Sequence, residues 1–202
     1  MAGGSVIEGI QTAVSGAIDY FLNFGKEIVV LEGVLLDVIV PGVGILISAS
    51  AVRDFMRIGN PKYQNKVSSS SVAIRFVIGP ATVQLVILMN AMAESIFGQE
   101  VASKATMSAL SYSGAPQGGD PTAALMIVIV SFLIFVGWVT ALRSMLAFSR
   151  MGDPQENGYQ LFRSGAARLV AATFLCMFQF VLDDVIQSFT GAAGVFSSSL
   201  NL

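Results

Sequence analysis

Five acidic side chains lie inside or beside apolar stretches of this sequence, where a carboxyl group can carry a proton or a cation across a membrane. All five fall in the outward halves of the membrane spans assigned below, and no basic residue stands opposite them at mid-depth. This placement favours pairing at the outer interface or with a partner subunit, and a proton or cation path is the alternative. The five acids are Glu32, Asp37, Glu94, Asp183 and Asp184.

Four arginines border the expected spans in matching positions. Arg57 and Arg150 stand in the last turn of a helix, where a cation interacts favourably with the helix dipole and with lipid phosphates. Arg75 and Arg168 stand just inside the following helix, within reach of the membrane interface. We therefore expect all four to anchor the chain to membrane lipid, with docking of a cytoplasmic partner as the alternative.

Residue types for catalysis or metal binding are scarce. The chain has no histidine, the usual general base and the commonest metal ligand. Its single cysteine, Cys176, lies in an apolar run and is expected to be a buried, inert thiol. The sequence contains no phosphate-binding loop, dinucleotide fingerprint, CxxC pair or nucleophile elbow. We therefore predict no enzymatic activity, no metal and no cofactor.

The elements that position these residues are expected to be membrane helices. Of the 202 residues, 54% are hydrophobic and 12% are charged, about half the charge of a soluble domain. We predict an all-α protein with four transmembrane helices, near residues 28–52, 72–97, 123–148 and 167–189. The predicted segments are an amphipathic helix at 1–27, a first two-helix unit at 28–98, a loop rich in serine, glycine and proline at 99–121, a second two-helix unit at 122–191 and a tail at 192–202.

The basic residues predict an orientation. Nine of the eleven lie in or beside the connections after the first and third expected spans, whereas only Lys26 and Lys104 fall on the other side. Loops rich in lysine and arginine stay in the cytoplasm. We therefore predict a multi-pass protein of a bacterial inner membrane with both termini in the periplasm.

The two basic connections repeat one motif at an offset of 93 residues. Residues 55–61 read FMRIGNP, and residues 148–154 read FSRMGDP. Each motif ends a helix, because its glycine can adopt the left-handed cap and its proline cannot continue the helix. These residues are Gly59 and Pro61 in the first motif and Gly152 and Pro154 in the second. We infer a duplicated hairpin of two helices, with both copies entering the membrane in the same orientation.

Small residues also recur at equivalent places in the two expected hairpins. Gly44 precedes Ser48 by four residues, and Gly137 precedes Ala141 by four. This spacing lets helices approach closely. We expect packing within the monomer, with contact between subunits as the alternative.

The turns RIGNP and RMGDP, the small size and the amphipathic N-terminal stretch resemble the IcmC/DotE family (with DotV and TraQ-like members) of type IVB secretion and IncI-type conjugation systems. The resemblance covers about residues 28–191 and is closest over RSMLAFSRMGDPQENGYQLFRSGAARLVAATFLCMFQFVLDDVIQSFTG. It implies a non-enzymatic inner-membrane subunit of a translocating machine. It also implies DotA/TraY-like membrane subunits as partners, a hetero- or homo-oligomer, and no direct binding of nucleic acid.

Two other functions fit the same sequence. A small transporter or channel that works alone would use the intramembrane acids to line a cavity. A pilin-like subunit that leaves the membrane for a filament would suit the Ser- and Gly-rich loop and tail, although four spans exceed the usual pilin hairpin.

Overall fold

The structure is a computed structural model, and it describes residues 27–58, 67–98 and 121–191 together with positions 16, 20 and 23–25. Gly59, Pro61, the tail, the loop before Pro121 and nearly all of the predicted helix at 1–27 lie outside these residues. Every regular element in the described part of the chain is a helix. The elements are the π-helix η1 (Leu35–Ile39) and the α-helices α2 (Val40–Phe55), α3 (Ser69–Val83), α4 (Leu85–Phe97), α6 (Pro121–Ser149), α7 (Gly158–Cys176) and α8 (Phe178–Thr190).

Two helices, Asn23–Phe55 and Val128–Ser149, are long and apolar enough to cross a membrane. Two pairs of helices meet the same criteria only when each is taken as one bent span: Ser69–Val83 with Leu85–Phe97, and Gly158–Cys176 with Phe180–Phe189. The described residues thus hold two to four candidate spans. The sequence predicted four spans, and the helices at the second and fourth are each bent at a break.

The π-helix η1 relieves a conflict at the following proline. Pro41 has no N–H to donate, and its ring would clash with the carbonyl group four residues earlier in a regular helix. The backbone widens just before it, and the N–H of Val40 bonds to the carbonyl of Leu35, five residues back. The helix therefore passes through Pro41 without a break.

The chain forms two compact units. The main unit comprises Glu32–Val101 and Val136–Met177, and the second comprises Met1–Leu31, Ala102–Phe135 and Phe178–Leu202. In the second unit, a Cβ added at Gly25 would meet the side chain of Val128. The main unit draws on both predicted hairpins, because ion pairs and helix contacts described below connect them.

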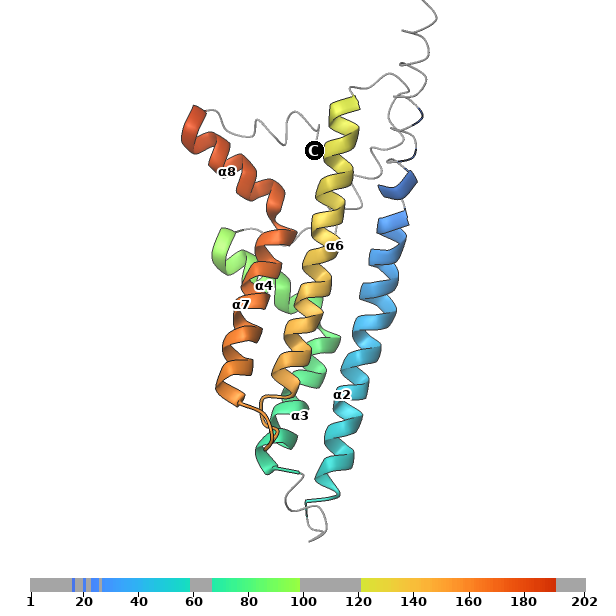
Figure 1. The fold of residues 1–202 in the computed structure, drawn as a ribbon, viewed down its shortest axis with the longest axis vertical. Coiled ribbons are helices and arrows are strands. Elements are labelled where there is room, and N and C mark those ends of the chain that lie inside the picture. The colour runs from blue at the N-terminus through green and yellow to red at the C-terminus, as the bar shows by residue number, and fades with distance from the viewer. Residues whose placement is uncertain are drawn as a thin grey trace, which may run out of the picture. The chain divides into compact units, whose positions relative to one another are not determined.

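In the main unit, α2 packs against α3 through two glycines (Figure 1). A Cβ added at Gly44 would come closer than 3 Å to Val83 and to the carbonyl of Gly79, and one added at Gly79 would collide with Ser48. Helices at this distance exclude larger side chains from the seam. The predicted pair Gly44 and Ser48 therefore packs within the chain.

The helices α6 and α7 make a similar seam. A Cβ added at Gly137 would meet Cys176 and the carbonyl of Ala172. Further along the seam, the buried Ser144 hydroxyl donates to the carbonyl of Gly165 at 2.7 Å. Ala141 is fully buried.

The second predicted span breaks at Gln84, where α4 leaves the axis of α3 at an angle of 84° (Figure 1). Two features weaken the helix before the break. Pro80 supplies no N–H, and the hydroxyl of Thr82 bonds back to the carbonyl of Ile78 at 2.7 Å, which favours bending. In its turned position, α4 contacts α7, where the Thr173 hydroxyl lies 3.9 Å from the sulfur of Met89.

Candidate functional site

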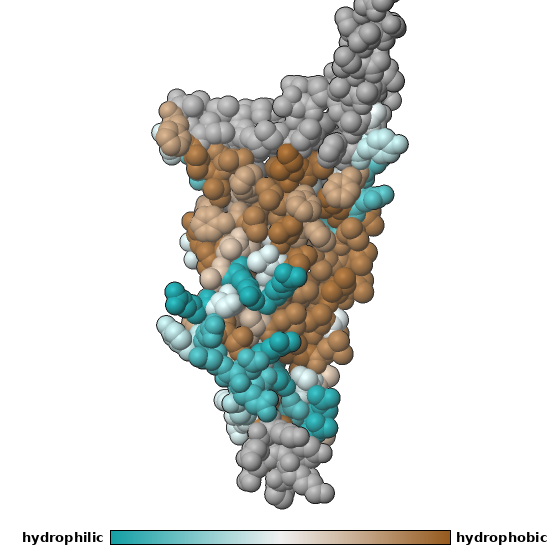
Figure 2. Space-filling view, in the orientation of Figure 1, coloured by the Kyte–Doolittle hydropathy of each residue, from teal (hydrophilic) through white to brown (hydrophobic). Residues whose placement is uncertain are grey.

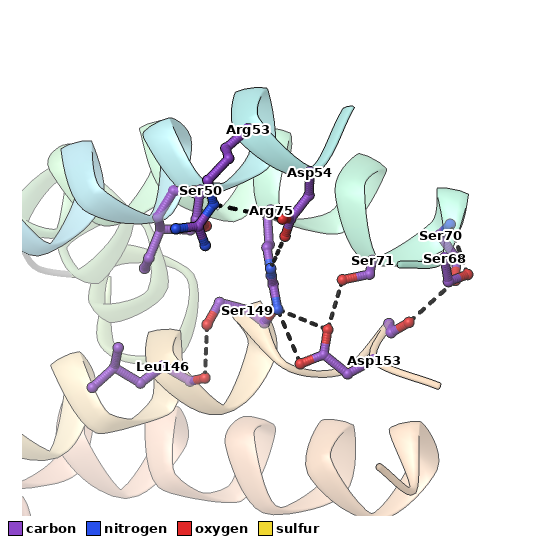
Figure 3. Close-up of polar contacts among 12 residues, drawn as sticks. Ser50, Arg53, Asp54, Ser68, Ser70, Ser71, Arg75, Leu146, Ser149 and Asp153 are labelled. Atoms are coloured by element: carbon purple, nitrogen blue, oxygen red, sulfur yellow. Dashed lines mark hydrogen bonds and ion pairs between the residues drawn. The ribbon is translucent and has the colours of Figure 1, made fainter. Parts of the chain in front are cut away.

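The clearest group of interacting polar side chains lies at the end of the main unit where α2 ends and α3 begins (Figure 3). The helix α3 begins after Ser68, whose side chain accepts a bond from the N–H of Ser70 at 3.3 Å. Side chains four residues apart share one face of a helix. Ser71 and Arg75 therefore project together from the start of α3.

The guanidinium of Arg75 holds three partners from different elements. It donates to Asp54 Oδ2 of α2 at 2.5 Å and to both carboxylate oxygens of Asp153 at 2.7 and 3.0 Å. Its Nε donates to the backbone carbonyl of Ser149, at the end of α6, at 3.2 Å. A planar guanidinium suits such multiple pairing, because its donors are fixed in a fork. We call Asp54, Arg75, Asp153 and the residues bonded to them the arginine cluster.

Serines complete the arginine cluster. Ser71 donates to Asp153 Oδ1 at 2.6 Å, and the hydroxyl of Ser70 lies 3.4 Å from the carbonyl of Gly152. A Cβ added at Gly152 would collide with the backbone of Ser70 and Ser71. Gly152 was predicted to end the helix as a left-handed cap, and this was wrong because its φ is not positive. The glycine instead lets the turn reach the start of α3.

The arginine cluster is largely shielded from solvent. The exposed fractions of the side chains are 18% for Arg75, 10% for Asp54 and 27% for Asp153. Partly buried charges need partners, because leaving one unpaired costs several kcal/mol. A second arginine, Arg53, approaches Asp54 at 3.8 Å, but its side chain is 63% exposed, so this ion pair adds little. The cluster is suited to holding α2, α3 and the turn after α6 together.

The other three arginines predicted at the interface lie elsewhere. Arg150 and Arg168 are exposed, and Arg57 is half-buried. Pro154 is exposed in the second turn. The structure therefore separates Arg75, which binds within the chain, from Arg150 and Arg168, whose side chains reach the surface.

The predicted acids are distributed over several helices. Glu32 is buried, whereas Asp37 in η1, Glu94 in α4 and Asp184 in α8 are exposed. Asp183 lies in α8, and its side chain is outside the described part. Among the described residues, no three His, Cys, Asp or Glu side chains are grouped so that they could hold a metal ion.

Sequence reasoning missed Asp54 and Asp153 as partners of Arg75. One signal was present, because the offset of 93 residues aligns Arg75 with Arg168 but aligns Asp54 with Ala147. An acid present in only one copy marks a contact that only one copy makes.

Comparisons of the chain with protein-family models, curated proteins and solved structures give no match.

Proposed function

We propose that the chain is a four-span membrane protein made of two duplicated hairpins, and that it is a non-enzymatic structural subunit of a bacterial secretion or conjugation apparatus of the type IVB kind. The observation that carries the structural role is the arginine cluster. Arg75 of the first hairpin binds Asp153 in the turn of the second. Partly buried charges are used there to fix helices against each other.

The duplication is supported by packing in the same register. Gly44 packs against Gly79 and Val83, and the residues 93 positions later, Gly137, Ala172 and Cys176, make the equivalent contact. Equivalent contacts at equivalent positions support the duplication more strongly than identical apolar residues in the sequence do.

The positions of the helix breaks and of the helix caps also support the duplication. The helix breaks fall at Gln84 and Met177, and the left-handed caps at Gly98 (φ 70°) and Gly191 (φ 71°), again 93 positions apart. A duplicated hairpin accounts for all of these coincidences at once.

The charge distribution supports the cytoplasmic placement of both turns. Hydrophilic side chains gather at the end of the main unit that carries the turns, and hydrophobic side chains cover the adjoining helices (Figure 2). The exposed arginines at this end are Arg53, Arg143, Arg150, Arg163 and Arg168. Basic loops are retained on the cytoplasmic side, so we propose that both termini lie in the periplasm.

The assignment to an IcmC/DotE-like subunit depends on the RIGNP and RMGDP turns. Partners of the DotA/TraY-like kind would contact the exposed apolar and basic surfaces. A mild-detergent purification of the tagged full chain from its native membrane should recover other inner-membrane subunits.

Topology reporters fused at residues 62 and 155 should both be retained in the cytoplasm. Export of either reporter would refute the two-hairpin arrangement. Purification of the chain alone, with solute flux in reconstituted liposomes, would refute the structural role in favour of a transporter. Substituting Arg57 and Arg150 together should impair transfer or assembly while leaving insertion intact.

A further inference from the structure

Arg168 occupies the place of Arg75 in the second hairpin but has none of its partners. Arg75 lies in α3 and donates four hydrogen bonds, to Asp54 of α2, to Ser149 at the end of α6 and to Asp153 in the turn after it. Arg168, 93 positions later in α7, is exposed and forms no ion pair with any residue that the structure describes. The two equivalent arginines therefore differ in what surrounds them.

The difference follows from the sequence. The acids that Arg75 binds are Asp54 and Asp153, and their equivalents for Arg168 are Ala147 and Asn60. Neither alanine nor asparagine can neutralise a guanidinium. Arg168 thus keeps the place of Arg75 in the repeat but has neither of the two carboxylate partners that Arg75 has.

Arg168 adjoins an exposed apolar face of α7. Val170 and Phe174 are 40% and 43% exposed, and Ala167 and Ala171 are exposed as well. Ala167 and Ala171 are four residues apart, a spacing that lets a second helix approach closely. Arg168 also lies five residues beyond Arg163 and hence about 7.5 Å further along the helix. If a second helix covers this apolar face, the charge of Arg168 is stabilised by an opposite charge on that helix.

We propose that this face of α7 binds a membrane helix of another subunit, and that an aspartate or glutamate of that helix pairs with Arg168. Charge complementarity identifies the partner, because the arginine in the same register of the first hairpin binds two carboxylates. A lipid phosphate could also neutralise Arg168, but it makes no use of the closely spaced alanines. The proposal rests on the duplication and on the subunit role inferred above.

The test places a photo-crosslinking amino acid at Ala171 of the full chain in its native membrane. Irradiation should link the chain to one membrane protein, at a peptide with an aspartate or glutamate within one helical turn. Arg168→Glu should lower the yield about tenfold or more, because the new glutamate would face the acid of the partner helix and repel it. Arg143→Glu, at an exposed arginine of α6, is the matched control on another helix and should change the yield less than about twofold. Replacing the partner's acid with arginine should restore crosslinking to the Arg168→Glu chain.

Crosslinking to phospholipid only, to no protein, or to a peptide without an acid would overturn the proposal. So would an unchanged yield with Arg168→Glu. Resistance of Cys176 to thiol reagents verifies that the variant is folded. If the chain still co-purifies with other subunits while the crosslink is absent, only this inference fails. Export of the reporter at residue 155 refutes the two-hairpin arrangement separately.

Discussion

Replacing Arg75 by glutamine tests whether the arginine cluster holds the main unit together. The change removes the charge that neutralises Asp54 and Asp153 and keeps a polar side chain of moderate length. Breaking a fully buried ion pair costs about 3–5 kcal/mol. Arg75 is 18% exposed and Asp153 is 27% exposed, so solvent screens part of this cost, and we expect a loss of about 2–3 kcal/mol in the free energy of unfolding.

Cys176 provides the assay for this loss. It is the single cysteine, and its side chain is buried in the seam between α6 and α7. A thiol-reactive dye in detergent solution therefore reports unfolding as the temperature rises. For a chain of this size a loss of 2–3 kcal/mol corresponds to a fall of about 4–12 °C in the unfolding midpoint.

Arg168→Gln is the matched control, because Arg168 has the same register and no ion pair among the described residues. Its midpoint should stay within about 2 °C of the parent, as for surface substitutions generally. A double variant, Arg75→Gln with Asp153→Asn, should lose less than the sum of the two single changes, because the substitutions remove the same contact. Equal midpoints for Arg75→Gln and Arg168→Gln would refute the structural role of the cluster.

Further predictions use the same thermal assay. Gly44→Ala should cost about 1–3 kcal/mol because its Cβ meets α3, whereas Gly42→Ala, with nothing within 4 Å, should stabilise the chain by up to about 1 kcal/mol. A similar loss of stability in the Gly44→Ala and Gly42→Ala variants would contradict the close packing of α2 against α3 at Gly44. Gly152→Ala should lower the midpoint because its Cβ collides with the start of α3, and an unchanged midpoint would argue against that approach. Gly98→Ala should cost about 1–2 kcal/mol because φ is 70°; a smaller loss would mean that the cap relaxes.

The helical class was predictable from the sequence because it depends on local composition. Long apolar segments with few charges predict helices, and every regular element among the described residues is a helix. Gly152 was also found as a turn residue, since glycine before Asp-Pro is a local signal. These features require no knowledge of which segments meet.

The arginine cluster and the helix breaks were not predictable in the same way. Arg75 binds Asp54, 21 residues before it, and Asp153, 78 residues after it, so the pairing depends on tertiary packing. The break at Gln84 has Pro80 nearby, but α7, which ends at the break at Met177, contains no proline. Apolar residues continue on both sides of each break. The position of a break was therefore hidden in an apolar sequence.

The shortness of α3 has a consequence for the lipid around it. Its 15 residues extend about 22 Å, roughly 8 Å less than the hydrocarbon layer of a typical bilayer. Since α4 then turns aside, acyl chains beside α3 would have to shorten or tilt, while those beside the 33-residue helix Asn23–Phe55 would not. A mismatch between the length of a helix and the thickness of the bilayer costs fractions of a kcal/mol per ångström. This cost falls when two proteins place helices of similar length side by side. Hydrophobic mismatch would thus favour assembly on the α3 side of the protein.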